Sequence, residues 1–115
     1  MKRALPFLLL LFLVSCSQYI KPRVVIDLAN QSQAAIKNVE VDYPGGTYGF
    51  SVLASGGVNH HTAEIDHQAC VFTVKFEDPA GHQLGGQPLK LGNPCPAKVS
   101  IVVDAQMAVS AEPGK

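Results

Sequence analysis

The stretch that decides the fold is Cys70-Val71-Phe72-Thr73-Val74-Lys75-Phe76-Glu77, in the second half of a 115-residue chain. Its apolar residues alternate in position, so that one face holds Cys70, Phe72, Val74 and Phe76. A period of two indicates a β-strand, because successive side chains of a strand point to opposite faces. The signal is the strongest of its kind in the chain, and it predicts a strand at the centre of a sheet.

The same two-residue period recurs on both sides of that stretch. Turn-forming residues separate the periodic segments, as in Pro44-Gly45-Gly46, Ser55-Gly56-Gly57 and Asp78-Pro79-Ala80-Gly81. The predicted strands cover residues 23–29, 37–43, 47–53, 58–65, 70–77, 87–91 and 98–103, and a weaker signal adds 107–110. The more polar segment 58–65 is expected at a sheet edge. The sole helical candidate, residues 31–36, is too short to be stable by itself.

Short strands spaced by about 8 to 12 residues are typical of a small all-β sandwich or barrel. We predict one domain over residues 23–111, an antiparallel immunoglobulin-like β-sandwich of about seven strands. The chain has no tryptophan, so the Cys…Trp…Cys hallmark of true immunoglobulin domains is missing and only the broader architecture is predicted. Residues 112–115 are expected to form a disordered tail.

The N-terminal residues have the pattern of a secretory signal. Lys2 and Arg3 provide a positively charged start, and an apolar run over residues 4–14 follows, interrupted by Pro6. This run is far shorter than the roughly 20 residues needed to cross a bilayer, so a retained transmembrane helix is not expected. The site typical of an exported soluble protein, of the A-x-A kind, is absent before Cys16.

The tetrad Leu13-Val14-Ser15-Cys16 resembles the lipobox of bacterial lipoproteins. The resemblance implies that residues 1–15 are a signal peptide that is removed, and that Cys16 becomes the lipidated first residue. Its sulfur takes a diacylglycerol, and its freed amine can take a further acyl chain. Each buried methylene contributes about 0.8 kcal/mol, so two or three chains make the attachment stable. Residues 16–22 would then be the lipidated N-terminus and a short stalk.

The residue after the cysteine bears on localisation. In lipoproteins of two-membrane bacteria, an aspartate at this position typically retains the protein in the inner membrane. Ser17 stands here instead. For such a host, the resemblance therefore implies a cell-envelope protein anchored by lipid to the outer membrane and facing the periplasm.

Charge and cysteine content restrict the partners further. Without Lys2 and Arg3, seven of the nine basic residues remain against nine acidic ones, a net charge of about −2. This balance argues against a nucleic-acid partner or an anionic membrane surface. Cys70 and Cys95 are left as an even pair in an oxidising compartment, which predicts one disulfide. Neither lies in a C-x-x-C motif, so redox exchange has no sequence support.

The candidate metal site is a histidine cluster. His60, His61 and His67 lie close together in sequence with Glu64 and Asp66, and such side chains are good ligands for zinc or copper. Neighbouring residues of a strand point to opposite faces, so at most His61 and His67 converge, through a turn. The favoured alternative is a polar edge strand that discourages pairing with other chains. We therefore predict no metal and no cofactor.

No pattern favours an enzyme. Ser51, Ser55 and Ser100 lie in no G-x-S-x-G elbow. Glu40 and Asp42 are two residues apart on a predicted strand, on a polar face that is expected to be solvated. We predict no catalytic residues and a non-catalytic binding or envelope-assembly module, whose partner is an unidentified envelope protein.

Two alternative functions are also consistent with the sequence. One is a periplasmic metal-binding lipoprotein that uses His60, His61 and His67. The other is a protein like the small periplasmic lipoproteins that inhibit lysozyme, although no local motif of that group is matched here. A lysozyme activity assay tests the second alternative, since the absence of inhibition would exclude it.

The lipobox and the cysteine pair make a prediction about mass. Protein extracted from membranes in mild detergent is expected to lack residues 1–15, to carry acyl chains on Cys16, and to be two hydrogens lighter than its reduced form. Intact mass spectrometry measures all three features. The Cys16→Ser variant should carry no acyl mass, and a full-length unacylated wild-type chain would refute the lipoprotein prediction.

Overall fold

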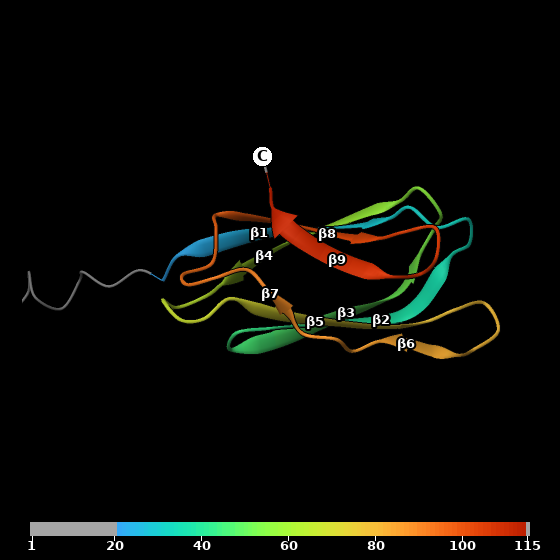
Figure 1. Cartoon of the computed structure of the whole chain (residues 1–115), viewed down its shortest axis with the longest axis horizontal. Coiled ribbons are helices and arrows are strands. Elements are labelled where there is room, and N and C mark those ends of the chain that lie inside the picture. Colours follow the sequence, from blue (N-terminus) through green and yellow to red (C-terminus); the bar gives the residue numbers. More distant parts are fainter. Residues whose placement is uncertain (1–20, 115) are drawn as a thin grey trace, which may run out of the picture.

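The computed structural model describes residues 21–114, which form nine strands in two sheets packed face to face (Figure 1). The predicted all-β sandwich is confirmed. The predicted signal peptide and Cys16 lie outside the described residues. Between residues 21 and 114, no helix is long and apolar enough to cross a membrane.

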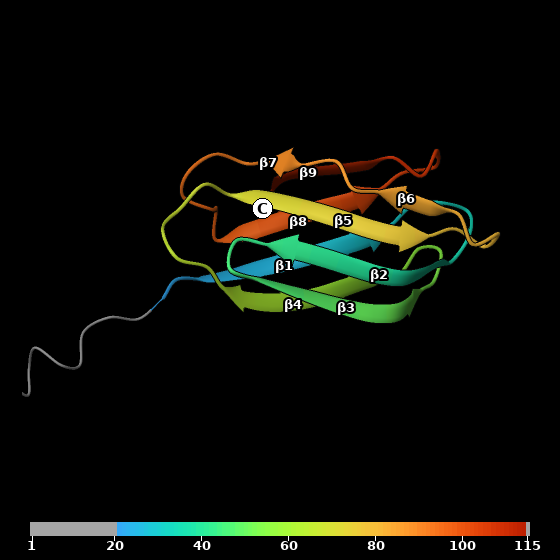
Figure 2. The same ribbon diagram turned by 90° about the horizontal axis from the view of Figure 1, so that it is seen from below.

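The first sheet, called sheet I, has the strand order β4-β1-β8-β9. Its strands are β1 (Arg23–Asn30), β4 (Val58–Glu64), β8 (Lys98–Val103) and β9 (Val109–Pro113). The second, called sheet II, has the order β3-β2-β5-β6, and β7 also pairs with β5 (Figure 2). Its strands are β2 (Ile36–Tyr43), β3 (Gly46–Leu53), β5 (Val71–Glu77), β6 (Gln83–Gly85) and β7 (Leu89–Lys90). As predicted, β5 is an interior strand and β4 is an edge strand.

The core lies between the two sheets, and most of its residues are those that the two-residue period selects. Sheet I contributes buried Val24, Ile26, Leu28, Ala63, Val99, Ile101 and Val103. Sheet II contributes buried Ile36, Val39, Val41, Leu53, Phe72, Val74 and Phe76. Each sheet has one apolar face, and packing the two faces together removes both from water.

One pairing in sheet I differs from the predicted antiparallel arrangement. Strands β1 and β8 run parallel, with Ile26 beside Val99 and Leu28 beside Ile101. The other strand pairs among the described residues are antiparallel. Parallel neighbours need a long connection, and here the chain between them builds β4 and the whole of sheet II. A two-residue period predicts strands but not which strands become neighbours.

The predicted strand over residues 87–91 is reduced to β7, and β6 lies before it. The break occurs at Gly85 and Gly86. Gly85 has a φ of +85°, and a Cβ there would lie 2.0 Å from the carbonyl oxygen of Val74. The N–H of Gly86 donates to that same oxygen at 2.8 Å. The chain leaves the ladder at these two residues, and Pro88 has no N–H with which to rejoin it at once.

The last strand starts later and runs further than predicted. The Oδ1 atom of Asp104 accepts hydrogen bonds from the N–H groups of Gln106 and Ala108, each at 2.9 Å. This turn holds Met107 at a φ of 62°, outside the strand region. Strand β9 then extends to Pro113, beyond the predicted start of a disordered tail at residue 112. Lys115 lies outside the described residues.

Residues 31–36 form no helix, because the buried side chain of Asn30 organises this segment differently. Its Nδ2 donates to the carbonyl oxygens of Ala34, at 2.9 Å, and Leu53, at 3.0 Å. Its Oδ1 accepts from the backbone N–H of Ser32 at 3.1 Å and from the Ser32 hydroxyl at 2.6 Å. The end of β1 in sheet I is thereby joined to the end of β3 in sheet II.

The strict alternation of buried and exposed side chains is interrupted at the start of β2 and at the end of β3. Asn38 has a φ of 47° and forms a bulge in the pairing of β2 with β5. Ile36 and Val39 both face the core although they are three residues apart. In β3 a two-residue period would place Val52 on the same face as Phe50, but Val52 is 57% exposed and Leu53 is buried instead.

The predicted disulfide joins Cys70 to Cys95, with a Cα–Cα distance of 4.8 Å. Cys70 directly precedes β5, and Cys95 lies in the loop before β8. Two backbone hydrogen bonds hold the same region, from the Cys70 N–H to Gly92 at 2.7 Å and from the Leu91 N–H to Cys70 at 2.8 Å. The disulfide therefore ties the start of a sheet II strand to the loop that returns to sheet I.

The Asn30→Ala substitution should destabilise the domain by about 3 kcal/mol, because it leaves buried backbone groups without hydrogen-bond partners. Denaturation in urea, followed by circular dichroism, measures the change. Gln31→Ala is the control, since Gln31 is exposed, and it should change stability by less than about 0.5 kcal/mol. Equal stabilities of the two variants would contradict the role assigned to Asn30.

Candidate functional site

The outer face of sheet I brings polar side chains from four strands together. The register places His60 of β4 beside Asp27 of β1, Asp27 beside Ser100 of β8, and Ser100 beside Glu112 of β9. Residues in register on adjacent strands share a face and lie side by side. These four residues, here called the polar row, therefore cross the full width of the sheet.

An apolar row lies next to the polar row. The same register aligns Val58 of β4, Ala29 of β1 and Val102 of β8. Val58 is 48% exposed, and Ala29 and Val102 are half-buried. On the other side of the polar row, Val25 is 37% exposed. The outer face of sheet I thus offers apolar contact area and hydrogen-bonding groups side by side.

Asp27 is the centre of the polar contacts. Its Oδ1 is 2.5 Å from Nδ1 of His60, and its Oδ2 is 3.3 Å from Nζ of Lys98. The hydrogen bond with His60 is the largest influence that lowers the pKa of Asp27; partial burial opposes it and Lys98 adds to it. The carboxylate form of Asp27 is therefore held between two donors from the neighbouring strands. Since His60 is largely exposed, these contacts contribute little to stability.

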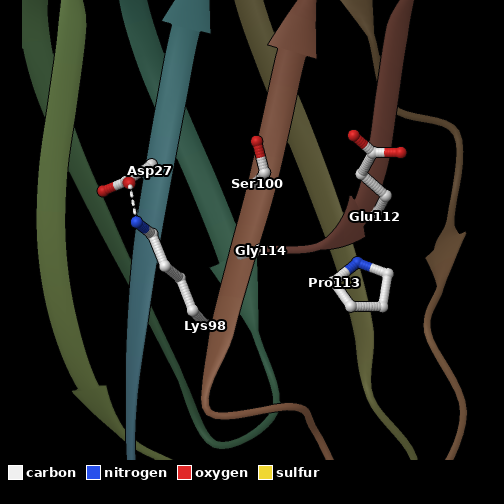
Figure 3. Close-up of a pocket in the computed structure, with 6 residues that line it drawn as sticks. All are labelled: Asp27, Lys98, Ser100, Glu112, Pro113 and Gly114. Atoms are coloured by element: carbon white, nitrogen blue, oxygen red, sulfur yellow. Dashed lines mark ion pairs between the residues drawn. The ribbon is translucent and has the colours of Figure 1, made fainter.

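A shallow pocket of about 340 Å³ opens beside this contact, lined by Asp27, Lys98, Ser100, Glu112, Pro113 and Gly114. Figure 3 shows the Asp27–Lys98 ion pair on one side of Ser100 and the carboxylate of Glu112 on the other. Within residues 21–114, Glu112 forms no ion pair with a lysine, arginine or histidine. The pocket therefore combines a paired carboxylate, a hydroxyl and an exposed carboxylate that is open to a ligand donor.

The structure separates the predicted histidine cluster. His60 faces outward to Asp27, whereas the half-buried ring of His61 stacks on Tyr48 with centroids 3.8 Å apart and an interplanar angle of 14°. This confirms that the two rings occupy opposite faces. His67 is exposed in the loop after β4. The part of the chain that the structure describes contains no group of three or more His, Cys, Asp or Glu residues placed to hold a metal ion.

His61 belongs to an aromatic cluster at one side of the sandwich. Tyr43 of β2 lies 6.1 Å from Tyr48 and 6.3 Å from His61, measured between ring centroids. Tyr48 comes from β3 in sheet II and His61 from β4 in sheet I, so their stacked rings bridge the two sheets. Burial raises the pKa of Tyr48, and within the described residues its hydroxyl has no hydrogen-bond partner. The cluster is a packing element between the edges of the two sheets.

Glu40 and Asp42 lie on the outer face of sheet II and make separate contacts. Glu40 is 3.8 Å from Nζ of Lys75, and both side chains are about half exposed. The hydroxyl of Thr47 donates to Asp42 at 2.6 Å. The two carboxylates are thus held by different neighbours and do not form an acid-base pair.

Sequence reasoning did not identify Asp27, Lys98 or Glu112 as site residues. Asp27 and Lys98 are 71 positions apart in the chain, and they meet because β1 and β8 are parallel neighbours. The sequence offers Ser100 only as a candidate nucleophile. The alternation of β1, β8 and β9 indicates that these residues face away from the core, but no local signal indicates that they share one row.

Comparison with known proteins relates this chain to one architecture. No family model and no curated protein matches the sequence. The structure is similar to the NMR structure of a protein from Eubacterium rectale, with a TM-score of 0.59 and 21% sequence identity. The match covers 83% of this chain and 91% of that chain. At this level of identity the similarity shows the fold alone, and it assigns no activity to the polar row.

The contact between Asp27 and His60 predicts the effect of removing the imidazole. His60→Ala should raise the pKa of Asp27 toward its ordinary value of 3.8, and more than Lys98→Ala does. An NMR titration of the Asp27 carboxyl carbon measures the pKa. His82→Ala is the matched control, since His82 contacts Asp78 at 3.0 Å instead. An unchanged pKa of Asp27 in the His60→Ala variant would contradict the assigned contact.

The lowered pKa of Asp27 also determines the direction in which folding stability changes with pH. The stabilisation due to ionised Asp27 is present above the unfolded-state pKa, near 3.8, and is lost as the pH falls through the lower folded-state pKa. The stability difference between wild type and Asp27→Asn should therefore shrink as the pH falls from 3.8 into more acidic solution. Urea denaturation at several pH values measures it, and a difference that grows in acid would contradict the sign.

Proposed function

We propose that this protein is a lipid-anchored, non-catalytic binding module of the outer membrane, which faces the periplasm and holds another envelope protein on the outer face of sheet I. The observation that carries the proposal is the adjacency of the polar row and the apolar row on that face. Interfaces between proteins combine an apolar centre with polar groups that fix orientation. The pocket beside Glu112 gives such a partner a place for a hydrogen-bond donor or a cation.

The start of the folded domain supports a position close to the membrane. The carbonyl oxygen of Pro22 accepts a hydrogen bond from the N–H of Ile65 at 3.0 Å. Pro22 is the sixth residue after Cys16, and six residues reach at most roughly 20 Å. One end of the sandwich contains the start of β1, the start of β8 and the disulfide. A lipid on Cys16 would therefore keep this end near the bilayer. The outer face of sheet I would then lie close to the membrane without being covered by it, and it would remain accessible from the periplasm.

The order of side chains in the polar row favours binding over hydrolysis. In a Ser-His-Asp triad the imidazole lies between the carboxylate and the hydroxyl. Here Asp27 lies between His60 and Ser100, so that β1 separates the two groups that would have to exchange a proton. With strands about 4.8 Å apart, the backbones at His60 and Ser100 are about 10 Å apart. Lys98 also pairs with the carboxylate, which suits a fixed recognition surface.

Photo-crosslinking in cells tests the proposal. A photoreactive residue in place of Ser100 should yield a discrete adduct with an envelope protein, because Ser100 lies at the centre of the proposed surface. The same residue in place of Lys75, on the outer face of sheet II, is the control and should yield none. Adding Glu112→Lys to the Ser100 variant should reduce the adduct several-fold. No adduct at Ser100, or equal adducts at both positions, would refute the proposed surface.

A further inference from the structure

The four sheet edges among the described residues differ in how they are protected against pairing with another chain. Strand β4 carries His60 and Glu64, and β9 is short and ends in Glu112 and Pro113. Strands β6 and β7 have three and two residues. Charged residues, proline and short length all discourage edge-to-edge pairing. These three edges are therefore protected.

Strand β3 has none of these protections. It is an edge strand of eight residues, Gly46-Thr47-Tyr48-Gly49-Phe50-Ser51-Val52-Leu53, without a charged residue or a proline. A long uncharged edge strand offers its free N–H and C=O groups to another strand. Among the edges of the described sheets, β3 is the one that is open to a partner strand.

The register of β2 and β3 shows which backbone groups of β3 are free. Tyr43 pairs with Gly46 across a two-residue turn, and Val41 with Tyr48. In such a hairpin, alternate pairs exchange both hydrogen bonds, beginning with the pair that flanks the turn. The N–H and C=O groups of Thr47, Gly49 and Ser51 then point away from β2. Leu53 follows the same alternation, since its carbonyl oxygen points outward and accepts the hydrogen bond from Asn30.

The centre of β3 has the same pattern in both directions. Thr47-Tyr48-Gly49-Phe50-Ser51 reads hydroxyl, aromatic, glycine, aromatic, hydroxyl. In an antiparallel pair of two such strands with a two-fold axis at Gly49, Tyr48 of each copy lies opposite Phe50 of the other. Thr47 of each copy then lies opposite Ser51 of the other. Aromatic pairs and hydroxyl pairs directly across two strands are both stabilising.

From this pattern we propose that two copies of the chain pair antiparallel through β3, with the two-fold axis at Gly49, and so join their second sheets into one continuous sheet. A two-fold interface uses the same patch on both copies, and this palindromic strand meets that condition. Tyr48 and Phe50 are half-buried in one copy, so pairing removes more of their rings from water.

Electrostatics permits this pairing. The charged residues nearest to β3 on the same sheet are Lys37, Glu40 and Asp42 of β2. In the paired sheet, the two β2 strands are three strand spacings apart, or about 14 Å. This exceeds the Debye length of about 8 Å at physiological ionic strength. On sheet II, the paired copies therefore bring no like charges into contact.

Register-specific crosslinking tests the proposal with the full chain in detergent, as extracted from membranes. Thr47→Cys and Ser51→Cys chains, carrying different tags, are mixed and oxidised. In the proposed register these two positions are directly opposite, within the Cα–Cα range of a disulfide, whereas two copies of residue 47 are about 14 Å apart. A mixed dimer at least tenfold above that of either variant alone is expected. The proposal would be overturned if no mixed dimer formed, or if each variant alone formed as much disulfide-linked dimer as the mixture.

Sedimentation of the same full chain over a range of concentrations provides a second test. Ser51→Lys places a charge on the exposed side of β3 and should weaken dimerisation at least tenfold. Thr62→Lys is the matched control, since Thr62 is exposed on the edge strand β4, and it should change the dissociation constant by less than twofold. A wild-type chain that stays monomeric, as expected if β3 takes a strand of a different protein, or equal effects of the two variants, would overturn the proposal.

Discussion

The structure depends on burying the apolar face of β5. Phe72, Val74 and Phe76 are all excluded from water, and a single sheet cannot cover such a face by itself. Sheet I supplies the opposing apolar surface. The disulfide between Cys70 and Cys95 holds the start of β5 against the loop that leads back to sheet I. Because a slip of one residue would turn every side chain of a strand to the opposite face, this packing also determines the register of the strands.

The proposed binding surface is a consequence of that register. Ile26 and Leu28 must face the core, so Asp27 between them must face outward. The neighbouring strands obey the same rule, which places His60 and Ser100 on the same outer face as Asp27. The core thus aligns the polar row although none of its members is part of the core. A rigid sheet also holds these groups in place without a ligand, which reduces the entropy lost when a partner binds.

Sequence periodicity was reliable where a strand is regular and failed where one segment meets another. Strand β6 ends at Gly85, where no side chain fits because the carbonyl oxygen of Val74 occupies its space. Asn30 directly follows the predicted strand over residues 23–29, yet it is buried and hydrogen-bonds to backbone groups of two other segments. Met107 lies in a turn organised by Asp104. In each case the local conformation depends on a contact with a residue that lies outside the periodic segment itself.

The sequence by itself determined the all-β class, the approximate position of every long strand, the buried face of most of them and the two cysteines available for a disulfide. These features follow from backbone geometry and from the hydrophobic effect, which act on neighbouring residues. Only the tertiary structure decided that β1 and β8 are parallel neighbours and that Lys98 and His60 meet at Asp27. Strand partners are chosen by contacts between residues far apart in the chain, and a two-residue period is the same whichever partner a strand takes.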